Sequence, residues 1–560
     1  MVGKHHIADK NYFFTSNAMK KYNKINNAMG WLMFVIAAAT YLLTIEPTAS
    51  FWDCPEFISQ GYKLEIGHPP GNPIFMLAAR FAINFVSDPQ YVSVAVNVMS
   101  AILSALTILL LFWTITHLVK KLVVNDGEEE SMTLTQYLLV MGSGVAGALA
   151  YTWSDTFWFS AVEAEVYAFS SFCTALVFWL ILKWENRADE PNSDRYLILI
   201  AYVIGVSIAV HLLNLLCIPA IVLVFYYKKY KDTTVKGSLI ALGVSFVIIA
   251  LILYGLVPGF VKAAQEFELF FVNALGMPYN SGVLIYTILN FAVFAWCLFE
   301  LYRQKNPTYI KVSFFAAVVL SGMLFFGNGW LIAAVLVIAL GIYLFKFCNR
   351  IPVRIFTLTA LSILVIFIGY SSYALILIRS NSHTPINQNC PDNVFSLSTY
   401  LNREQYGERP LLYGQTFNSG IVYKDNGNGG YSPEKSAGKD LYAKDVTSTH
   451  QGRDRYFMKG NDYKYKMNPE LNMLFPRMYS GAHANEYKEW VNLQGEVVNA
   501  TTRLDREGNP IALEPKVKPT FIENLQFFID YQLNYMYWRY FMWNFAGRQN
   551  DNSAQGEITN

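Results

Sequence analysis

Long apolar runs separated by short polar connections fill the first two thirds of the chain. A helix that crosses a bilayer needs about 20 mostly apolar residues, and eleven stretches approach that length. A break near His211 divides the fifth from the sixth, and Gly327-Asn328-Gly329 divides the ninth from the tenth. We predict spans at residues 28–46, 91–118, 134–152, 164–182, 196–210, 212–227, 237–256, 284–302, 312–327, 330–346 and 355–377.

The lysines and arginines between these runs predict an orientation, because cytoplasmic loops are rich in both. With residues 1–27 as a cytoplasmic N-terminal segment, twenty of these side chains fall in the cytoplasmic segments. Only Lys63, Arg80 and Lys262 fall in the outer loops. An odd number of spans then places residues 378–560 outside. The first run also resembles a signal peptide that ends near Thr48-Ala49-Ser50, but it is longer than a usual signal core.

Composition supports this division of the chain. Of the 560 residues, 53% are hydrophobic and 15% are charged, against about 25% charged in soluble domains. The net charge of +2 argues against a nucleic-acid partner, and six cysteines are too few for a disulfide framework. Residues 378–560 are richer in charge, glycine, asparagine and tyrosine. We therefore predict a mainly α, polytopic helical bundle over residues 28–377 and a soluble α+β or irregular outer domain over 378–560.

Residues 521–545 crowd tyrosine, tryptophan and phenylalanine into one segment. Tyr and Trp favour the boundary between lipid and water. One interpretation is an interfacial helix that closes over a lipid-facing site. The alternative is a buried packing helix of the outer domain, and the sequence does not separate the two.

The outer side of the predicted bundle gathers the ionisable residues that could carry chemistry. The long first outer loop, residues 47–90, contains Asp53 and Glu56, whose spacing places two carboxylates on one face of a helix. Such a pair could take a proton from a hydroxyl group or bind a cation, although a helix start would also explain it. Residues 72–86 are apolar but short, which favours an interfacial helix over a span.

Further candidates lie at the outer ends of later helices. Glu163 and Glu165 are at the start of an apolar helix, where an acid is costly unless it faces a cavity or a partner. Capping or snorkelling would explain them equally well. We predict that residues beside these acids bind substrate, and that basic residues at the same side bind a donor phosphate. The substrate candidates are Glu163, Glu165, Tyr167 and Asp155, and the phosphate candidates are His68, His211, Arg379 and Arg80.

Several segments resemble one protein family. Directly after the first apolar run, Asp53 and Glu56 are followed about ten residues later by His68-Pro69-Pro70-Gly71. This order is similar to a bacterial family of polytopic proteins of unassigned function, which is related to the animal endoplasmic-reticulum O-mannosyltransferase that modifies IPT domains. Matching stretches continue at Phe157–Tyr167, Thr399–Tyr413 and Trp543–Gln549.

The resemblance implies a GT-C glycosyltransferase fold in a bacterial inner membrane, with the outer domain in the periplasm. It implies inverting transfer of a sugar, mannose above others, from a polyprenyl-phosphate donor to Ser or Thr of an exported protein. Asp53 occupies the position of the catalytic base, and Glu56 fills a second acidic position. The bacterial members continue beyond the Trp543–Gln549 segment, so the resemblance also implies a shortened member.

The resemblance requires no cofactor, and we expect no metal, although a divalent ion between Asp53 and another acid is an alternative. The rival functions are a lipid-linked sugar flippase or transporter, a non-catalytic scaffold, and an enzyme that uses another sugar or a glycan or lipid acceptor. Transporters usually show paired repeats and polar groups near the midplane, and neither is evident in this sequence. A Cys54–Cys390 disulfide is a further, minor alternative in an oxidising compartment.

Overall fold

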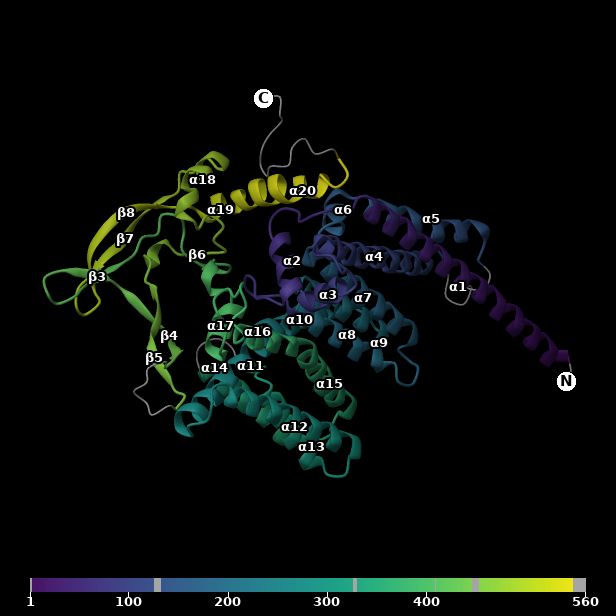
Figure 1. Ribbon diagram of the computed structural model, residues 1–560, viewed down its shortest axis with the longest axis horizontal. Helices are drawn as coiled ribbons and strands as arrows, with labels where there is room; N and C mark the ends of the chain where they lie inside the picture. The colour runs from purple at the N-terminus through teal and green to yellow at the C-terminus, as the bar shows by residue number, and fades with distance from the viewer. Residues whose placement is uncertain (1–2, 125–131, 326–329, 408, 446–452, 547–560) are drawn as a thin grey trace. The chain divides into compact units, whose positions relative to one another are not determined.

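The computed structural model describes residues 3–124, 132–325, 330–407, 409–445 and 453–546 (Figure 1). The chain divides into two compact units. The first comprises Met1–Arg403 with Thr449–Arg455, and the second comprises Glu404–Ser448 with Tyr456–Asn560.

The first unit is helical throughout. Its first half contains α1 (Gly3–Leu43), α2 (Cys54–Lys63), α3 (Pro73–Ile83), α4 (Val92–Val123), α5 (Leu134–Thr152), α6 (Asp155–Ala161), α7 (Val166–Arg187) and α8 (Asp194–Ile208). The second half contains η2 (Leu212–Cys217), α9 (Ile218–Lys229), α10 (Val235–Ala250), η3 (Leu251–Leu256), α11 (Val257–Glu268), η4 (Leu269–Ala274), α12 (Ser281–Arg303), α13 (Pro307–Leu320), α14 (Trp330–Ile342), η5 (Tyr343–Phe347), α15 (Val353–Tyr370), η6 (Ser371–Tyr373), α16 (Ala374–Ser380) and α17 (Val394–Leu401).

Each of the eleven predicted spans coincides with a helix. Among the described residues, eight helices are long and apolar enough to cross a membrane. The other three predicted spans correspond to the shorter helices α8, α13 and α14–η5. They fall in the two pairs that the sequence divides only by a short break. The prediction of a polytopic helical bundle is confirmed.

The seventh predicted span is longer in the structure than in the sequence analysis. The helix that begins at Val235 continues through η3, α11 and η4 to Ala274, whereas the prediction ended it at residue 256. Its later part carries Lys262, Glu266 and Glu268, which lower the hydropathy without interrupting the helix. Glu268 is fully buried and accepts hydrogen bonds from the backbone N–H groups of Asn280 and Val283 at the start of α12.

Two short helices lie between the first two spans. α2 and α3 pack on each other where Gly61 meets Ala79, with no room for a larger side chain at position 61. Their buried residues Phe57, Phe75 and Ala79 join Val96 of α4 in one apolar cluster. This cluster packs the segment between the first two spans against α4. The prediction of a short helix within residues 72–86 is confirmed by α3.

The second unit combines small sheets with helices. A four-stranded sheet has the order β3 (Tyr431–Pro433), β2 (Tyr423–Asp425), β7 (Glu496–Leu504) and β8 (Pro510–Lys518), in which β2 and β7 are parallel and the other pairs antiparallel. Two further antiparallel pairs are β1 (Tyr413–Gly414) with β6 (Met473–Leu474), and β4 (Lys435–Lys444) with β5 (Tyr456–Tyr465). The helices are α18 (Ala484–Trp490), α19 (Phe521–Phe527), η11 (Phe528–Trp538) and α20 (Arg539–Met542). The predicted α+β character of this region is confirmed.

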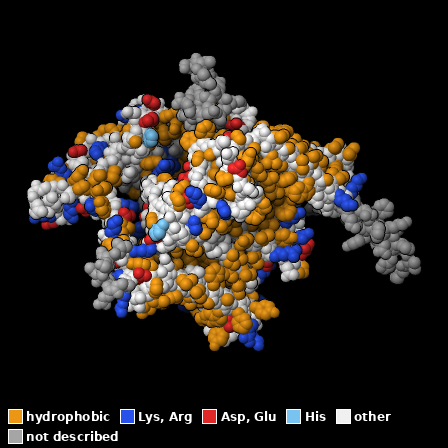
Figure 2. Space-filling model, in the orientation of Figure 1, with side chains coloured by type: hydrophobic (Ala, Val, Ile, Leu, Met, Phe, Trp, Pro, Cys, Tyr) orange, Lys and Arg blue, Asp and Glu red, His pale blue; other side chains and the backbone are white. Residues whose placement is uncertain are grey.

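The two units differ in surface chemistry. In the face shown in Figure 2, hydrophobic side chains dominate the helical unit, while acidic and basic side chains gather at its margins and over the strands. An apolar outer surface on a helical bundle suits contact with lipid. The first unit is therefore the integral membrane part of the chain.

Candidate active site

Asp53 lies immediately before α2, the first helix after the first span, which ends at Leu43. It occupies the N-cap position, just before the helix rather than on it, and Pro55 follows in the first turn. An N-cap aspartate usually accepts a backbone hydrogen bond, but the Asp53 side chain makes no capping bond here. The side chain is 55% exposed. Its carboxylate is therefore open to a substrate.

Glu56 bonds the imidazole of His68. The Nδ1 atom of His68 lies 3.1 Å from Oε1 of Glu56, and the His68 backbone N–H donates to the same oxygen at 2.6 Å. The Gln60 amide donates to it at 2.8 Å. The intervening residue Gly67 lies so close to Glu56 and Gln60 that any side chain would clash. The absence of a side chain at position 67 thus allows His68 to reach Glu56.

The opposite edge of the His68 ring, which carries Nε2, points toward Asp53. The Nε2 atom of His68 is 3.8 Å from Oδ2 of Asp53, so one imidazole lies between two carboxylates. The hydrogen bond to Glu56 raises the pKa of His68, and the charges of both acids add to this effect against the opposing effect of burial. Burial alone would raise the pKa of Glu56, but the hydrogen bonds from His68 and Gln60 outweigh it and lower that pKa. The site therefore favours an imidazolium flanked by two carboxylates.

A segment far along the chain holds the loop of His68 in place. Tyr400 of α17 is fully buried, and its hydroxyl donates to the carbonyl of Gly67 at 2.7 Å and is 3.3 Å from that of His68. Ile66 pairs with Asn387 in a short β-bridge. Gly71 has a left-handed φ of 73°, and an added side chain would meet Tyr400 and Ile376. This packing fixes the position of the imidazole.

Two buried acids lie behind Asp53. Glu165 is the N-cap of α7, and its Oε1 is 4.0 Å from the Sγ of Cys54. Burial, with the charges of Glu163 and Asp53, raises the pKa of Glu165 to about 7. Burial likewise raises the pKa of Glu163, whose Oε2 has no hydrogen-bond partner among the described residues. Both side chains are buried close to Asp53, and Glu165 also caps α7 through a hydrogen bond from the backbone N–H of Val166, as the capping alternative predicted.

His211, Tyr167 and Asp155 lie on neighbouring elements. The rings of His211 and Tyr167 are 5.5 Å apart. The Nδ1 of His211 accepts from the backbone N–H of Leu213, so the imidazole caps η2. Burial lowers the pKa of His211, with the charge of Arg403 as a second cause. Asp155 is exposed in the first turn of α6.

Arg379 and Arg80 lie at the far end of α2 from Asp53. The guanidinium of Arg379 donates to the carbonyls of Leu64 and Lys63 at 2.8 and 3.0 Å, and that of Arg80 donates to the carbonyl of Tyr62 at 2.6 Å. α2 is ten residues long, which separates its two ends by about 15 Å. These two arginines therefore stabilise the C-terminal end of α2, and the structure does not bring them to the acids.

Arg403 is a basic residue of the site that sequence reasoning missed. Its charge lowers the pKa of both His68 and His211, although burial and hydrogen bonding act more strongly on each. Its backbone N–H donates to the carbonyl of Tyr400 at 3.1 Å, which ties it to the residue that holds the His68 loop. It lies within the Thr399–Tyr413 segment that carries part of the family resemblance. That segment was the available signal, but it is too far along the chain from His68 for a sequence pattern to link the two.

The acids and His68 also form a potential cation site. One ligand atom each from Asp53, Glu56 and His68 lie within 4.8 Å of one another. However, the Oε1 of Glu56 already accepts three hydrogen bonds. A cation would therefore use Asp53 and the Nε2 of His68, with Glu56 orienting the ring from behind.

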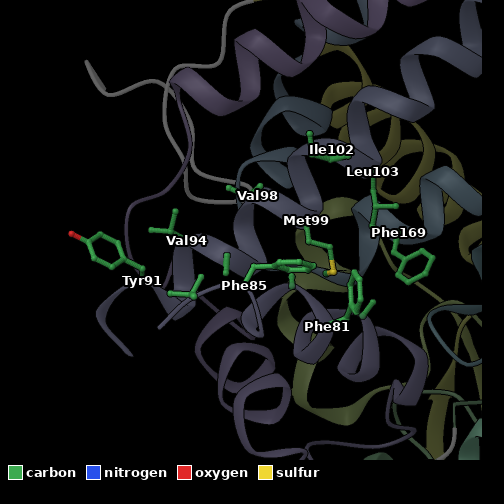
Figure 3. A pocket seen from close by; sticks show the side chains of 13 residues that line it. Phe81, Phe85, Tyr91, Val94, Val98, Met99, Ile102, Leu103 and Phe169 are labelled. Carbon is green, nitrogen blue, oxygen red and sulfur yellow. The ribbon is translucent and has the colours of Figure 1, made fainter. Parts of the chain in front are cut away.

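An apolar groove of about 590 Å³ opens between α3 and α4. Phe81 of α3 and Phe85, just beyond the end of that helix, face Met99 and Leu103 of α4 across it, and Phe169 of α7 closes one end (Figure 3). Ala95, Met99 and Phe169 of this lining also pack against the cluster that contains Cys54 and Phe57. The groove and the acidic site thus share one wall of packed side chains.

Comparisons with known proteins place the acidic site within a recognised region. Residues 53–234 match the family model described as the Protein O-mannosyl-transferase TMEM260 N-terminal domain. This range begins at Asp53 and includes Glu56, His68, Glu163, Glu165 and His211. Residues 407–529, most of which belong to the second unit, match a family of unknown function (DUF8416).

Two curated relatives are similar to the same part of the chain. Protein O-mannosyl-transferase TMEM260 of Mus musculus is 25% identical over 207 residues, which are 36% of this chain and 26% of the mouse protein. The corresponding protein of Dictyostelium discoideum is 24% identical over 205 residues, which are 35% of this chain and 22% of that protein. The chain thus spans about a quarter of the length of the curated relatives it matches.

Proposed function

We propose that the chain is a membrane glycosyltransferase that transfers mannose from polyprenyl-phosphate mannose to Ser or Thr of an exported protein, with inversion at the sugar. One observation carries the proposal. The accessible carboxylate of Asp53 lies beside His68 at the start of the region that is similar to protein O-mannosyl-transferases.

In the proposed reaction, Asp53 is the general base. It takes the proton of the acceptor hydroxyl as that oxygen attacks the anomeric carbon from the face opposite the phosphate. The bond between the anomeric carbon and the phosphate oxygen breaks, and polyprenyl phosphate leaves with the electron pair. The proton remains on Asp53 until water removes it. General base catalysis of this kind contributes about 10²–10⁴-fold.

His68 and Arg403 supply the positive charge that a leaving phosphate needs. Glu56 acts through His68, because its hydrogen bond to Nδ1 keeps the ring protonated and directs Nε2 toward Asp53. Glu163 and Glu165 border the space in which sugar and acceptor would lie, together with Tyr167 and the His211 ring that packs on it. Asp155, exposed on α6, is a further substrate candidate. The mechanism uses no cofactor and no metal, so chelation is expected to leave the rate unchanged.

The apolar groove between α3 and α4 supports a lipid-linked donor. It lies against a candidate membrane span, Pro89–Val123, and shares a wall with the acidic site. A polyprenyl chain in this groove would leave its phosphate near His68. With the topology predicted from the lysines and arginines, the site would lie on the periplasmic side of a bacterial inner membrane.

The decisive test is transfer of radiolabelled mannose in proteoliposomes that contain the chain, polyprenyl-phosphate mannose and a Ser/Thr-rich peptide. We expect Asp53→Asn to abolish nearly all transfer. Asp88→Asn is the matched control, because Asp88 is an exposed acid of the same loop that caps the short 3-10 helix η1 (Pro89–Tyr91). Equal transfer by Asp53→Asn and the unaltered chain would refute the proposed base. Donor movement across the bilayer without transfer would favour a flippase.

A further inference from the structure

The helical segment α19–η11–α20 presents an apolar face that the second unit leaves uncovered. Its inner side packs on that unit, where Phe527 and Tyr531 contact Tyr487 and Trp490. Its outer side exposes large apolar side chains along the whole length, with fractional exposures from 37% to 77%. Representative members are Ile522, Leu525, Ile529, Trp538, Phe541 and Phe545.

The charged side chains of this segment are all half-buried. Glu523 is half-buried and accepts the backbone N–H groups of Gln494 and Gly495. Asp530 is half-buried. Arg539 is also half-buried, with its guanidinium 3.7 Å from the ring centre of Tyr535 and 4.8 Å from that of Trp543. Within residues 521–546, the exposed positions therefore carry no charge, which is unfavourable for a helix in water.

We propose that this face binds the surface of a lipid bilayer. Tryptophan, tyrosine and aliphatic side chains along one side of a helix are typical of segments that lie in the membrane interface. The membrane spans of the same chain also hold the second unit close to a bilayer. The second unit begins at Glu404, about 24 residues after the last candidate span ends at Ser380. Such a tether keeps the local concentration of membrane surface high.

Spin labels on the full chain in nanodiscs would test this assignment. Single cysteines are placed at Ile522, Ile529, Trp538 and Phe541, in a Cys390→Ser background, because Cys390 is exposed and the other five cysteines are buried. Matched controls are Val497→Cys and Ile511→Cys, at exposed apolar positions on β7 and β8 of the same unit. Collisions with oxygen, which concentrates in lipid, are compared with collisions with a water-soluble nickel chelate.

We expect the four helix labels to be severalfold more accessible to oxygen, relative to the nickel chelate, than the two strand labels. Ratios equal to those of the strand labels would mean that the face is in water, and would overturn the proposal. Exclusion of both quenchers at all four positions would mean that a protein surface covers the helix, and would overturn it as well. The readout is independent of sugar transfer.

Discussion

The Oε1 atom of Glu56 is 3.1 Å from Nδ1 of His68, and Nε2 of the same ring is 3.8 Å from Oδ2 of Asp53. Glu56 therefore acts on Asp53 through the imidazole as well as through its own nearby charge. A carboxylate behind a histidine fixes the orientation of the ring and favours its protonated form. The second acid of the loop thus controls a positive charge next to the proposed base.

Glu56→Gln tests this control. Because Glu56 raises the pKa of His68, its loss should lower that pKa, and the imidazolium should disappear at a lower pH than in the unaltered chain. We expect the alkaline limb of the kcat/KM profile to move to lower pH. The acid limb should move less. Glu266→Gln, at an exposed acid of α11, is the control, and an unmoved alkaline limb would contradict the assigned role.

Glu165 should make thermal stability depend on pH. Its pKa is raised to about 7 in the folded chain, mainly by burial, from an ordinary value of 4.5. The folded state therefore holds a proton that the unfolded chain releases, and the resulting stability is present at low pH and is lost as the pH rises from about 4.5 through 7. We expect the melting temperature, followed by tryptophan fluorescence, to fall over this range. Glu165→Gln, which cannot ionise, should flatten the dependence. An unchanged slope would show that Glu165 already ionises at an ordinary pKa.

Arg403 and Arg379 should respond differently to substitution. Arg403→Gln removes a positive charge that acts on both His68 and His211, and we expect the donor KM to rise by about tenfold, as for loss of an interaction with a charged group. Arg403→Lys should restore part of the affinity. Arg379→Gln removes hydrogen bonds to the carbonyls of Lys63 and Leu64, so it should lower the melting temperature without a specific effect on donor KM. A specific rise in donor KM for Arg379→Gln, and none for Arg403→Gln, would mean that Arg379 binds the phosphate.

The groove between α3 and α4 can be tested by filling it. Ala82→Trp and Ala95→Trp each place an indole at a position that lines the groove. We expect a severalfold rise in KM for donors with a long polyprenyl chain and little change for a donor with two isoprene units. Leu239→Trp, on an exposed position of α10, is the control. An equal rise in KM for both donors would mean that the tryptophan disturbs the acidic site rather than the binding of the polyprenyl chain.

Hydropathy was sufficient to predict the bundle but not all of its boundaries. The eleven apolar runs all correspond to helices, because the cost of burying free backbone groups in lipid leaves few alternatives. Hydropathy alone, however, predicted that the seventh helix ends at residue 256, too early in the chain. The charges of Lys262, Glu266 and Glu268 lowered the hydropathy there, while the hydrogen bonds between Glu268 and the start of α12 compensate one of them.

The sequence predicted which residues belong to the candidate site better than it predicted which of them contact one another. Asp53, Glu56 and His68 were identified from one loop, but the spacing of the two acids predicted that both lie on one face of a helix, whereas Asp53 is the N-cap before α2. Their actual arrangement depends on Gly67, which lets the chain turn back so that His68 reaches Glu56. The Tyr400 and Arg403 contributions come from more than three hundred residues away, and no local pattern in a single sequence indicates such a contact.

The buried Tyr400 hydroxyl links the last helix of the first unit to the loop that follows its first span. The site is consequently assembled late in synthesis. The acids and His68 are translated early, but the residue that holds their loop emerges only after all the helices between them. A nascent chain that has not reached α17 should therefore carry every acid of the site and still lack its shape.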